Sequence, residues 1–316
     1  MIEYTTINDA VSGAMAYVMA VSVILTLLIT VLMITFVIRY HRTRHPVAEQ
    51  VESNVFLEVV WTVIPTILAL AMFYYGWVGY RMMRTPPADA MEVTATGRMW
   101  SWSFEYENGK QSTELYVPVG QAIKVNLESV DVLHSFYIPA YMIKQDAVPG
   151  LTQFVWFLPE EEGTYNIFCA EYCGERHSFM ITKCIVVPAA EFTEWVERDV
   201  AVVALQAEGA SEEELQAQLA DAGERLSVLK GCNACHSVDG SALVGPTYKG
   251  LYGKTEMVIT DGTRRQVTVD DAYIRRSMLE PNADITEGFQ PLMPSQAGLV
   301  TDEEIDALIA YIKTLQ

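Results

Sequence analysis

The feature that most constrains this 316-residue chain is a run without any charged residue between positions 10 and 38. At about 1.5 Å of rise per residue, about 20 apolar residues let a helix cross the hydrocarbon core of a bilayer. A signal peptide is the alternative. Its apolar region is typically about 7 to 15 residues long and follows positive charge, whereas this run follows Glu3 and Asp9. The run therefore predicts a membrane-spanning helix.

A second uncharged run covers residues 59–80 and contains Pro65, which neighbouring helices can accommodate within a membrane. The connection "RYHRTRHP", residues 39–46, holds three arginines and two histidines. Short basic loops of this kind stay on the cytoplasmic side, so both ends of the chain should face outward. Residues 1–88 are therefore expected to form an N-terminal segment and a two-helix transmembrane hairpin.

The pattern beyond residue 88 changes to short alternating segments such as "MEVTATG", "AIKVNLESV" and "TQFVWFL", separated by Gly, Pro and acidic turns. This pattern predicts an all-β sandwich or Greek-key barrel over residues 89–190. Residues 191–211 are expected to form a helix and a polar linker. A third, helical unit is expected over residues 212–316.

The charge balance narrows the possible partners. The chain has 21 Lys and Arg against 40 Asp and Glu, a formal net charge of −19. Nucleic-acid binding requires a basic face, so nucleic acid is excluded as a partner. An acidic surface instead favours contact with a basic protein.

The stretch "CAEYCGERHSFM", residues 169–180, concentrates soft metal ligands in one loop between predicted strands. Cys169, Cys173, His177 and Met180 supply two thiolates, an imidazole and a thioether, a combination that suits copper. Zinc is one alternative, although the spacing is not that of a finger or ribbon. A disulfide between the two cysteines is another, but it would leave the histidine and methionine unexplained.

Only three histidines lie outside the predicted membrane hairpin and its loop, and each falls in a motif. His134, in "DVLHSFYIP", begins an apolar strand 35 positions before Cys169, where a sheet could bring it beside the copper loop. His236 lies in "GCNACHS", whose C-x-x-C-H pattern with Cys232 and Cys235 is the attachment motif of a c-type haem. A thioredoxin-like pair is the alternative, but it would need a βαβ context that is missing here.

The motifs "DVLHSFYIP", "KQDAVPG" and "CAEYCGERHSFM" together resemble subunit II of haem–copper cytochrome c oxidases over roughly residues 10–190. The region 212–316 resembles class I cytochromes c, which makes the whole similar to a caa3-type fusion. The resemblance implies a membrane-anchored multidomain protein. Its parts would be a two-helix transmembrane hairpin, an all-β cupredoxin (Greek-key) domain and an all-α class I cytochrome c domain.

The resemblance also implies a binuclear copper centre, CuA, in the cupredoxin domain. Cys169 and Cys173 would bridge the two coppers, with the remaining ligands supplied by His134, the carbonyl of Glu171, His177 and Met180. The side chain of Glu171 would reach a magnesium ion shared with subunit I, although an acidic loop residue is ordinarily just solvated.

Two further residues acquire roles from the resemblance. Trp100 would relay electrons toward CuA; alternation in "MWSWSFEY" places it on one strand face with Trp102, which ordinarily means core packing. Glu58 would lie by a proton entrance into subunit I, although a charged residue at a membrane helix end can simply be interfacial.

The haem unit would use His236 as its proximal iron ligand after attachment through Cys232 and Cys235. A distal methionine raises the potential of such a haem into the range of electron carriers. Met293, in "PLMPS" shortly before the terminal helical pattern, matches the family's context for this ligand. Met257 and Met278 are the alternatives, and Met278 has the helical spacing of a core residue.

The function that the resemblance implies is that of the electron-entry subunit of a terminal cytochrome c oxidase. Electrons would pass from an external cytochrome or respiratory complex through haem c and CuA to subunit I, where oxygen is reduced. Subunit III would be a further partner. The chain would lie in a bacterial inner membrane, with its N-terminus and both redox domains on the periplasmic side. An electron-entry subunit of a nitric oxide reductase and a membrane-bound carrier without a pumping partner are the alternatives.

Overall fold

The structure is a computed structural model that describes all residues except 1–5, 48–49, 51–52 and 199–210. The chain divides into two compact units, Met1–Ala88 and Asp89–Gln316, and each is described by itself. The predicted polar linker lies largely outside the described residues.

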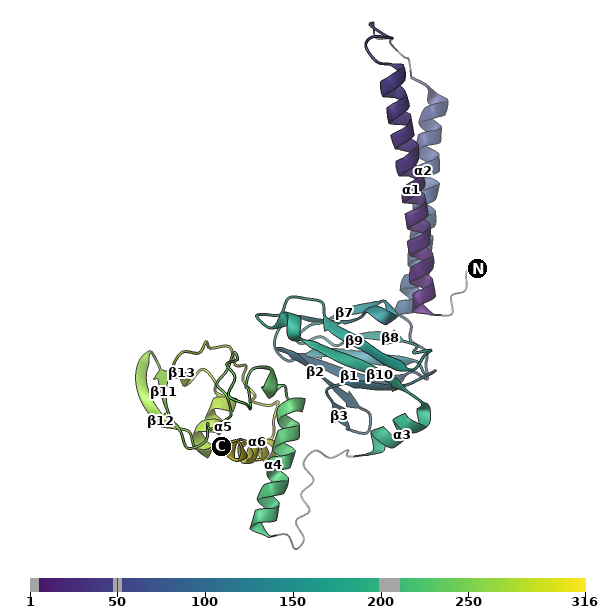
Figure 1. The fold of residues 1–316 in the computed structure, drawn as a ribbon. Helices are drawn as coiled ribbons and strands as arrows, with labels where there is room; N and C mark the ends of the chain where they lie inside the picture. The colour runs from purple at the N-terminus through teal and green to yellow at the C-terminus, as the bar shows by residue number, and fades with distance from the viewer. Residues whose placement is uncertain (1–5, 48–49, 51–52, 199–210) are drawn as a thin grey trace. The chain divides into compact units, whose positions relative to one another are not determined.

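The first unit is a hairpin of two long helices, α1 (Ile7–Arg39) and α2 (Val55–Met83), which run side by side (Figure 1). Both are long and apolar enough to cross a membrane. Their large apolar side chains are mostly exposed, as expected for helices that face lipid. The helices meet at Tyr17, whose hydroxyl donates to the Leu68 carbonyl at 3.1 Å and whose ring stacks on Tyr75. The predicted two-helix hairpin is confirmed.

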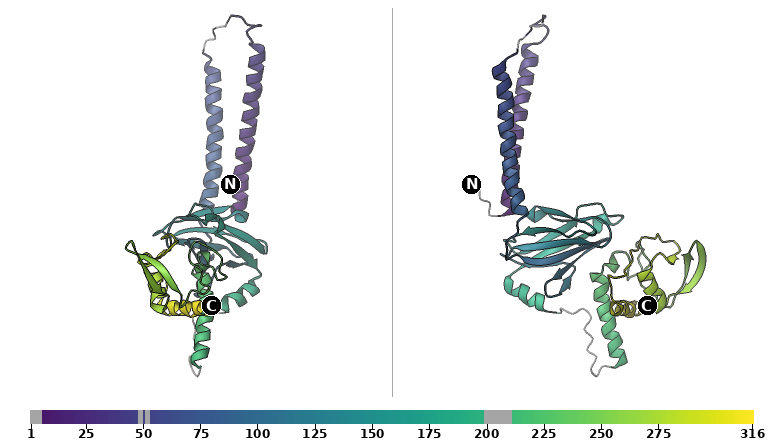
Figure 2. Two further views of the ribbon diagram at one scale, coloured as in Figure 1. Left: turned by 60° about the vertical axis from the view of Figure 1, so that its left-hand side comes forward. Right: turned by 180° about the vertical axis from the view of Figure 1, so that it is seen from behind.

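The second unit begins with a β-sandwich of two five-stranded sheets (Figure 2). The strand order is β3-β2-β1-β5-β8 in one sheet and β4-β10-β9-β6-β7 in the other. The strands are β1 (Met91–Arg98), β2 (Ser101–Tyr106), β3 (Gln111–Ser112), β4 (Leu115–Pro118), β5 (Ile123–Ser129), β6 (His134–Ile138), β7 (Ile143–Ala147), β8 (Gln153–Phe157), β9 (Gly163–Cys169) and β10 (Ile181–Val187). Buried residues alternate along β1, β2 and β5, which confirms the predicted sandwich.

A short helix, α3 (Ala189–Glu197), follows the sandwich. Its Trp195 stacks on Tyr116 with ring centroids 4.2 Å apart, and Lys110 lies over the same indole at 4.5 Å. These contacts hold the helix against β4, as predicted for a helical segment after the last strand.

The remaining helices, α4 (Glu212–Leu229), α5 (Asp271–Leu279) and α6 (Asp302–Thr314), form the helical C-terminal domain. Capping boxes begin α4 at Ser211 and α6 at Thr301. The two helices pack so closely that a Cβ added to Gly223 would lie 2.0 Å from the Ala307 carbonyl oxygen. Only glycine permits this crossing.

This helical domain also contains a three-stranded sheet that was not predicted. Strands β11 (Thr255–Thr260) and β12 (Thr263–Thr268) form a hairpin, and β13 (Ile285–Thr286) pairs with β11. The turn is Asp261–Gly262, and both residues have positive φ, as a tight hairpin turn requires. The prediction of an entirely helical unit was therefore incomplete.

Candidate copper and haem sites

The loop 169–180 connects β9 to β10, which are antiparallel neighbours. Cys169 is the last residue of β9 and Met180 directly precedes β10; the Cys169 amide donates to the Met180 carbonyl at 3.1 Å. The pairing of Phe136 with Cys169 brings the start of β6, and hence His134, beside the loop. The sheet thus joins the two motifs that lie 35 positions apart in sequence.

The donor atoms of the proposed copper ligands converge on two sulfur atoms. The two Sγ atoms of Cys169 and Cys173 lie 3.7 Å apart. His134 Nδ1 lies 3.9 Å from the first sulfur, and His177 Nδ1 lies 3.5 Å from the second. Met180 Sδ is 3.8 Å from Cys173 Sγ. The sixth predicted group, the carbonyl oxygen of Glu171, accepts from Cys169 Sγ at 3.2 Å.

This donor set fits a pair of soft metal ions better than the alternatives do. A disulfide requires sulfur atoms about 2.05 Å apart, and both cysteines are free. A structural zinc ion takes four ligands, whereas six groups meet here, two of them thiols with a thioether nearby. Thiolate, imidazole and thioether ligands are those that copper prefers.

The electrostatics of the cysteine pair favour a cation. Burial opposes ionisation of Cys169, but the hydrogen bond with His134 helps to lower its pKa to about 6. Burial and the neighbouring Cys169 charge raise the pKa of Cys173 to about 12. The first thiolate therefore forms readily, whereas the second requires compensating positive charge, which metal ions would supply.

The ring of His134 is held by groups outside the set of donors. Its Nε2 lies 2.8 Å from Asp131 Oδ1, which leaves Nδ1 facing the sulfur atoms. The ring is fully buried, and a Cβ added to Gly97 would lie 3.0 Å from His134 Cδ2. Asp131 also accepts from the Met99 amide at 2.7 Å, so one carboxylate orients both the ring of the predicted ligand His134 and the start of the turn that holds Trp100.

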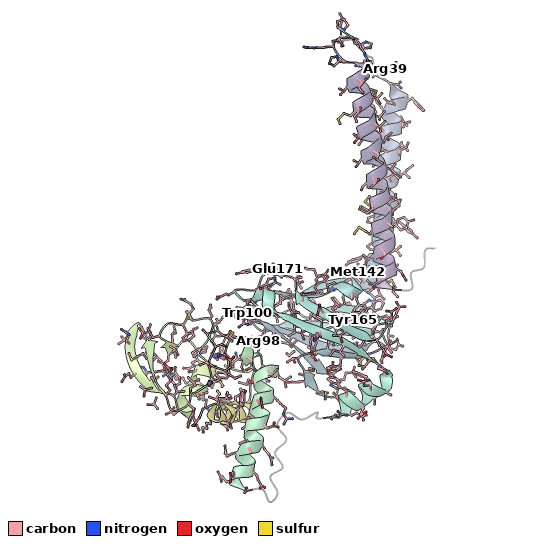
Figure 3. All side chains as sticks on the ribbon, viewed as in Figure 1. Arg39, Arg98, Trp100, Met142, Tyr165 and Glu171 are labelled. Carbon is pink, nitrogen blue, oxygen red and sulfur yellow. The ribbon has the colours of Figure 1, made fainter. Side chains whose placement is uncertain are left out.

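Trp100 touches the copper loop directly, although its place in the fold differs from the prediction. Strand β2 begins at Ser101, so Trp100 lies in the turn between β1 and β2 and not on a strand face with Trp102. Its indole Nε1 donates to the Cys173 carbonyl at 3.0 Å (labelled in Figure 3). Trp102 instead packs edge-on against the His134 ring, 6.0 Å between centroids. The geometry distinguishes a loop-contacting indole from a core indole.

The two acidic candidates, Glu171 and Glu58, are not held by contacts of the kind that fix Trp100 and His134. Glu171 is half-buried in the copper loop (Figure 3), and among the described residues its carboxylate forms no hydrogen bond or ion pair. Glu58 is exposed in the first turn of α2. Both positions leave a carboxylate available for a partner.

The haem motif opens a cavity in the C-terminal domain. Cys232, Cys235 and His236 line it on one side, and Met293 lines it from the segment before α6. Met278 also borders the cavity, but it is only 6% exposed and belongs to the packed core, while Met257 lies on β11. The position of Met293 is therefore compatible with the predicted ligand role.

The cavity fits a covalently attached haem with His236 as ligand. The His236 Nδ1 donates to the Pro246 carbonyl at 2.7 Å, which leaves Nε2 as the free ring nitrogen. Burial lowers the pKa of His236 and keeps the imidazole neutral, as metal ligation requires. A Cβ on Gly245 would lie 2.6 Å from His236 Cε1, so the ring sits in a cradle that admits only glycine.

Sequence reasoning missed two residues at these sites. Asp131 lies in the motif "DVLHSFYIP", three positions before His134, and a carboxylate so close to a candidate histidine ligand is a readable signal, because such histidines commonly donate their other ring N–H to a carboxylate. Arg98 lines the haem cavity although it ends strand β1 of the sandwich. No local pattern signals that long-range contact.

Comparisons with known proteins agree with this arrangement. Family models for cytochrome c oxidase subunit II match residues 5–76 (transmembrane domain) and 110–189 (periplasmic domain), and a cytochrome c model matches 220–316. A cytochrome c oxidase subunit 2 of Alkalihalophilus pseudofirmus is 31% identical over 279 residues, which cover 85% of this chain and 76% of that protein.

Two further similarities cover less of the chain. An alternative cytochrome c oxidase subunit 2 of Bradyrhizobium diazoefficiens is 34% identical, covering 40% of this chain and 58% of that protein. The crystal structure of the periplasmic domain of subunit II of a Bradyrhizobium japonicum cytochrome oxidase is 34% identical, with a TM-score of 0.34. It covers 36% of this chain and 95% of that one. The three family matches and the relative that covers 85% of this chain show that the chain belongs to the cytochrome c oxidase subunit II family and carries a C-terminal cytochrome c domain.

Proposed function

We propose that this chain is the electron-entry subunit of its oxidase, taking electrons from an external donor on haem c and passing them through CuA to the oxygen-reducing subunit I. The observation that carries the proposal is the convergence of four donor groups on the sulfur atoms of Cys169 and Cys173, with the Trp100 indole bonded to the same loop. Haem c and CuA, when bound, each take up and release one electron at a time.

The protein's contribution at the copper site is a set of fixed ligands. Cys169 and Cys173 would hold both metals of the pair, and His134, the Glu171 carbonyl, His177 and Met180 would supply the remaining ligands. The loop ends are tied into β9 and β10, and Asp131 fixes the His134 ring, so the ligands need move little between redox states. Small rearrangement favours electron transfer over substrate chemistry.

At the haem site, Cys232 and Cys235 would attach the macrocycle, and His236 and Met293 would hold the iron through a ring nitrogen and a thioether sulfur. The bond from His236 to Pro246 sets the tautomer and orientation of the ring. A thioether opposite an imidazole favours the reduced iron and raises the potential.

Three further residues receive roles in the proposal, one within this chain and two at its partners. Trp100 is the relay between the haem domain and CuA, supported by its hydrogen bond to the Cys173 carbonyl. The free carboxylate of Glu171 would bind magnesium at the contact with subunit I. Glu58, at the start of α2, would lie at a proton entrance of subunit I.

The proposal divides the chain into four parts: the membrane hairpin (1–88), the copper domain (89–190), a helix and linker (191–211) and the haem domain (212–316). The hairpin is embedded beside subunit I, with subunit III as a further neighbour. Covalent attachment of a c-type haem is a process of the outer side of the inner membrane. Both redox domains and the N-terminus therefore lie on the periplasmic side of a bacterial inner membrane. A cytochrome or another respiratory complex donates the electrons.

The test is purification of the chain with its neighbours. We expect one c-type haem per chain by pyridine treatment, two coppers with a delocalised seven-line electron paramagnetic resonance spectrum, and a partner that holds a haem–copper centre reducing oxygen. A single copper with a four-line spectrum would refute the CuA assignment. A largest partner that reduces nitric oxide instead would select the alternative, a nitric oxide reductase.

A further inference from the structure

Arg98, the last residue of β1, joins the copper-binding sandwich to the haem domain within the unit Asp89–Gln316. Its Nη1 donates to the Lys230 carbonyl at 2.9 Å and to Gln296 Oε1 at 2.8 Å. The two acceptors are 132 and 198 positions away in sequence. One guanidinium therefore links three segments of the chain: the end of β1, the end of α4 and the loop that contains Gln296.

Both acceptors belong to residues that line the haem crevice. Lys230 is the C-cap of α4, two positions before the attachment residue Cys232. Gln296 follows the ligand candidate Met293 by three positions, and its backbone amide donates to the Met278 carbonyl at 2.9 Å. Arg98 thus joins the segment that precedes the attachment motif to the segment that follows the methionine candidate.

The chemistry of the contact suits an arginine. The Lys230 carbonyl lies at a helix C-terminus, where the helix dipole favours a cation. The Lys230 ammonium itself pairs with Glu304 at 3.0 Å, which removes a competing positive charge. Both bonds leave the same nitrogen, Nη1, whose two N–H groups point in fixed directions in the guanidinium plane, so the two acceptors are held at a fixed angle to each other.

The surrounding backbone is close enough to make the contact tight. A Cβ added to Gly231, which has a φ of +71°, would lie 2.3 Å from Ser101 Oγ. The segment between these contacts is short: Arg98 is followed by Met99, whose amide is held by Asp131, and then by Trp100, which bonds to the Cys173 carbonyl. The three consecutive residues 98–100 and one hydrogen bond therefore connect the crevice contact to the copper loop.

We propose that Arg98 is a positioning residue that seats the haem crevice against the turn carrying Trp100, and so sets the rate of electron transfer from haem c to CuA. This inference rests on the proposed function. Hydrogen bonds from a charged donor are strong enough to change a docking equilibrium by about tenfold or more.

The experiment uses the whole oxidase with Arg98→Gln, Arg98→Lys and Gln296→Ala. We expect Arg98→Gln to slow haem c-to-CuA transfer about tenfold in time-resolved absorption, with Arg98→Lys and Gln296→Ala intermediate. The potentials of both centres and the rate from CuA to subunit I should stay unchanged. Hydrogen exchange of amides 229–233 should rise in the same order. The matched control is Arg198→Gln, which removes an exposed arginine of the same unit that pairs with Glu194.

Normal transfer rates and normal amide exchange in Arg98→Gln would overturn the proposal. If the Arg98→Gln oxidase does not assemble, Gln296→Ala provides the test, through the same transfer rate and the same amide exchange. Failure of the proposed function looks different, because the unaltered oxidase would then show no transfer from haem c to CuA at all.

Discussion

Five of the six proposed copper ligands lie within the twelve residues 169–180, whereas the haem crevice draws on residues 98–99 and on segments from residue 230 to residue 312. The copper loop is held at both ends by the β9–β10 pair, and its two cysteines are buried beside His134. The haem crevice is a cavity inside the core of its domain, lined by core residues such as Met278 and Ile274. The copper site should therefore form on a folded scaffold, while the C-terminal domain should need its cofactor to complete its core.

The largest expected effect comes from removing the haem attachment. In Cys232→Ala/Cys235→Ala we expect no covalent haem by pyridine treatment and loss of the cooperative unfolding of the C-terminal domain, because a core cavity is left unfilled. The copper spectrum should persist, which serves as the internal control. If calorimetry showed cooperative unfolding of the haem-free domain, this domain would not need its cofactor to complete its core, and the two sites would not differ in this respect.

The matching change at the copper loop should spare the fold. Cys173→Ser removes one of the two bridging sulfurs, so we expect the binuclear spectrum to disappear while the sandwich still unfolds cooperatively. Met180→Leu is the graded partner variant: it should retain both coppers in metal analysis but localise the electron, since the axial thioether tunes the site more than it binds the metal. Loss of copper from Met180→Leu would show that the thioether is needed for binding.

A smaller effect separates the candidate methionines of the haem domain. Met293→Ala should lower the haem potential in a redox titration, because axial ligands move haem potentials over a range of about 0.8 V. Met278→Ala should leave the potential nearly unchanged but destabilise the domain by about 2–5 kcal/mol, since it removes a buried core side chain. The reverse outcome would reassign the distal ligand.

The smallest predicted effect concerns Asp284, which ties the unpredicted sheet to α5. Its carboxylate is buried, accepts hydrogen bonds from Thr260 and Arg265, and forms an ion pair with Arg276 at 3.0 Å. Burial opposes ionisation, but the hydrogen bonds from Thr260 and Arg265 lower the pKa of Asp284. Asp284→Asn should cost about 1–3 kcal/mol at neutral pH, a modest figure because both arginines are partly exposed.

The pH dependence gives this prediction its control. A lowered pKa in the folded state means that the stabilisation is complete above the usual carboxyl range and is lost as pH falls through the lowered value. The difference between Asp284→Asn and the unaltered domain in thermal unfolding should therefore shrink on acidification. A difference that stays constant with pH would show that the negative charge of Asp284 does not contribute to the stability of the domain.

The sequence predicted those parts of the molecule whose physical cause is local. The copper loop and the C-x-x-C-H motif are short spacings of reactive residues, and the membrane helices are long uncharged runs. The hairpin β11–β12 had a readable signal, alternating residues around Asp261–Gly262, that was overlooked in a region expected to be helical. The position of Trp100 and the contact of Arg98 depend on Asp131 and Lys230, which only the folded chain brings near.

Arg98 and Met99 form part of the wall of the haem crevice. A rigid macrocycle must enter before such a wall closes, so we expect a fixed order of biogenesis, with haem ligation first and seating on the sandwich afterwards. Chains arrested before haem ligation should then expose residues 98–101 to hydrogen exchange, and mature chains should protect them. Equal protection in both would mean that the wall closes independently of maturation. The closing of this wall would in that way act as a checkpoint, because a chain lacking haem would not present a finished route to the copper loop.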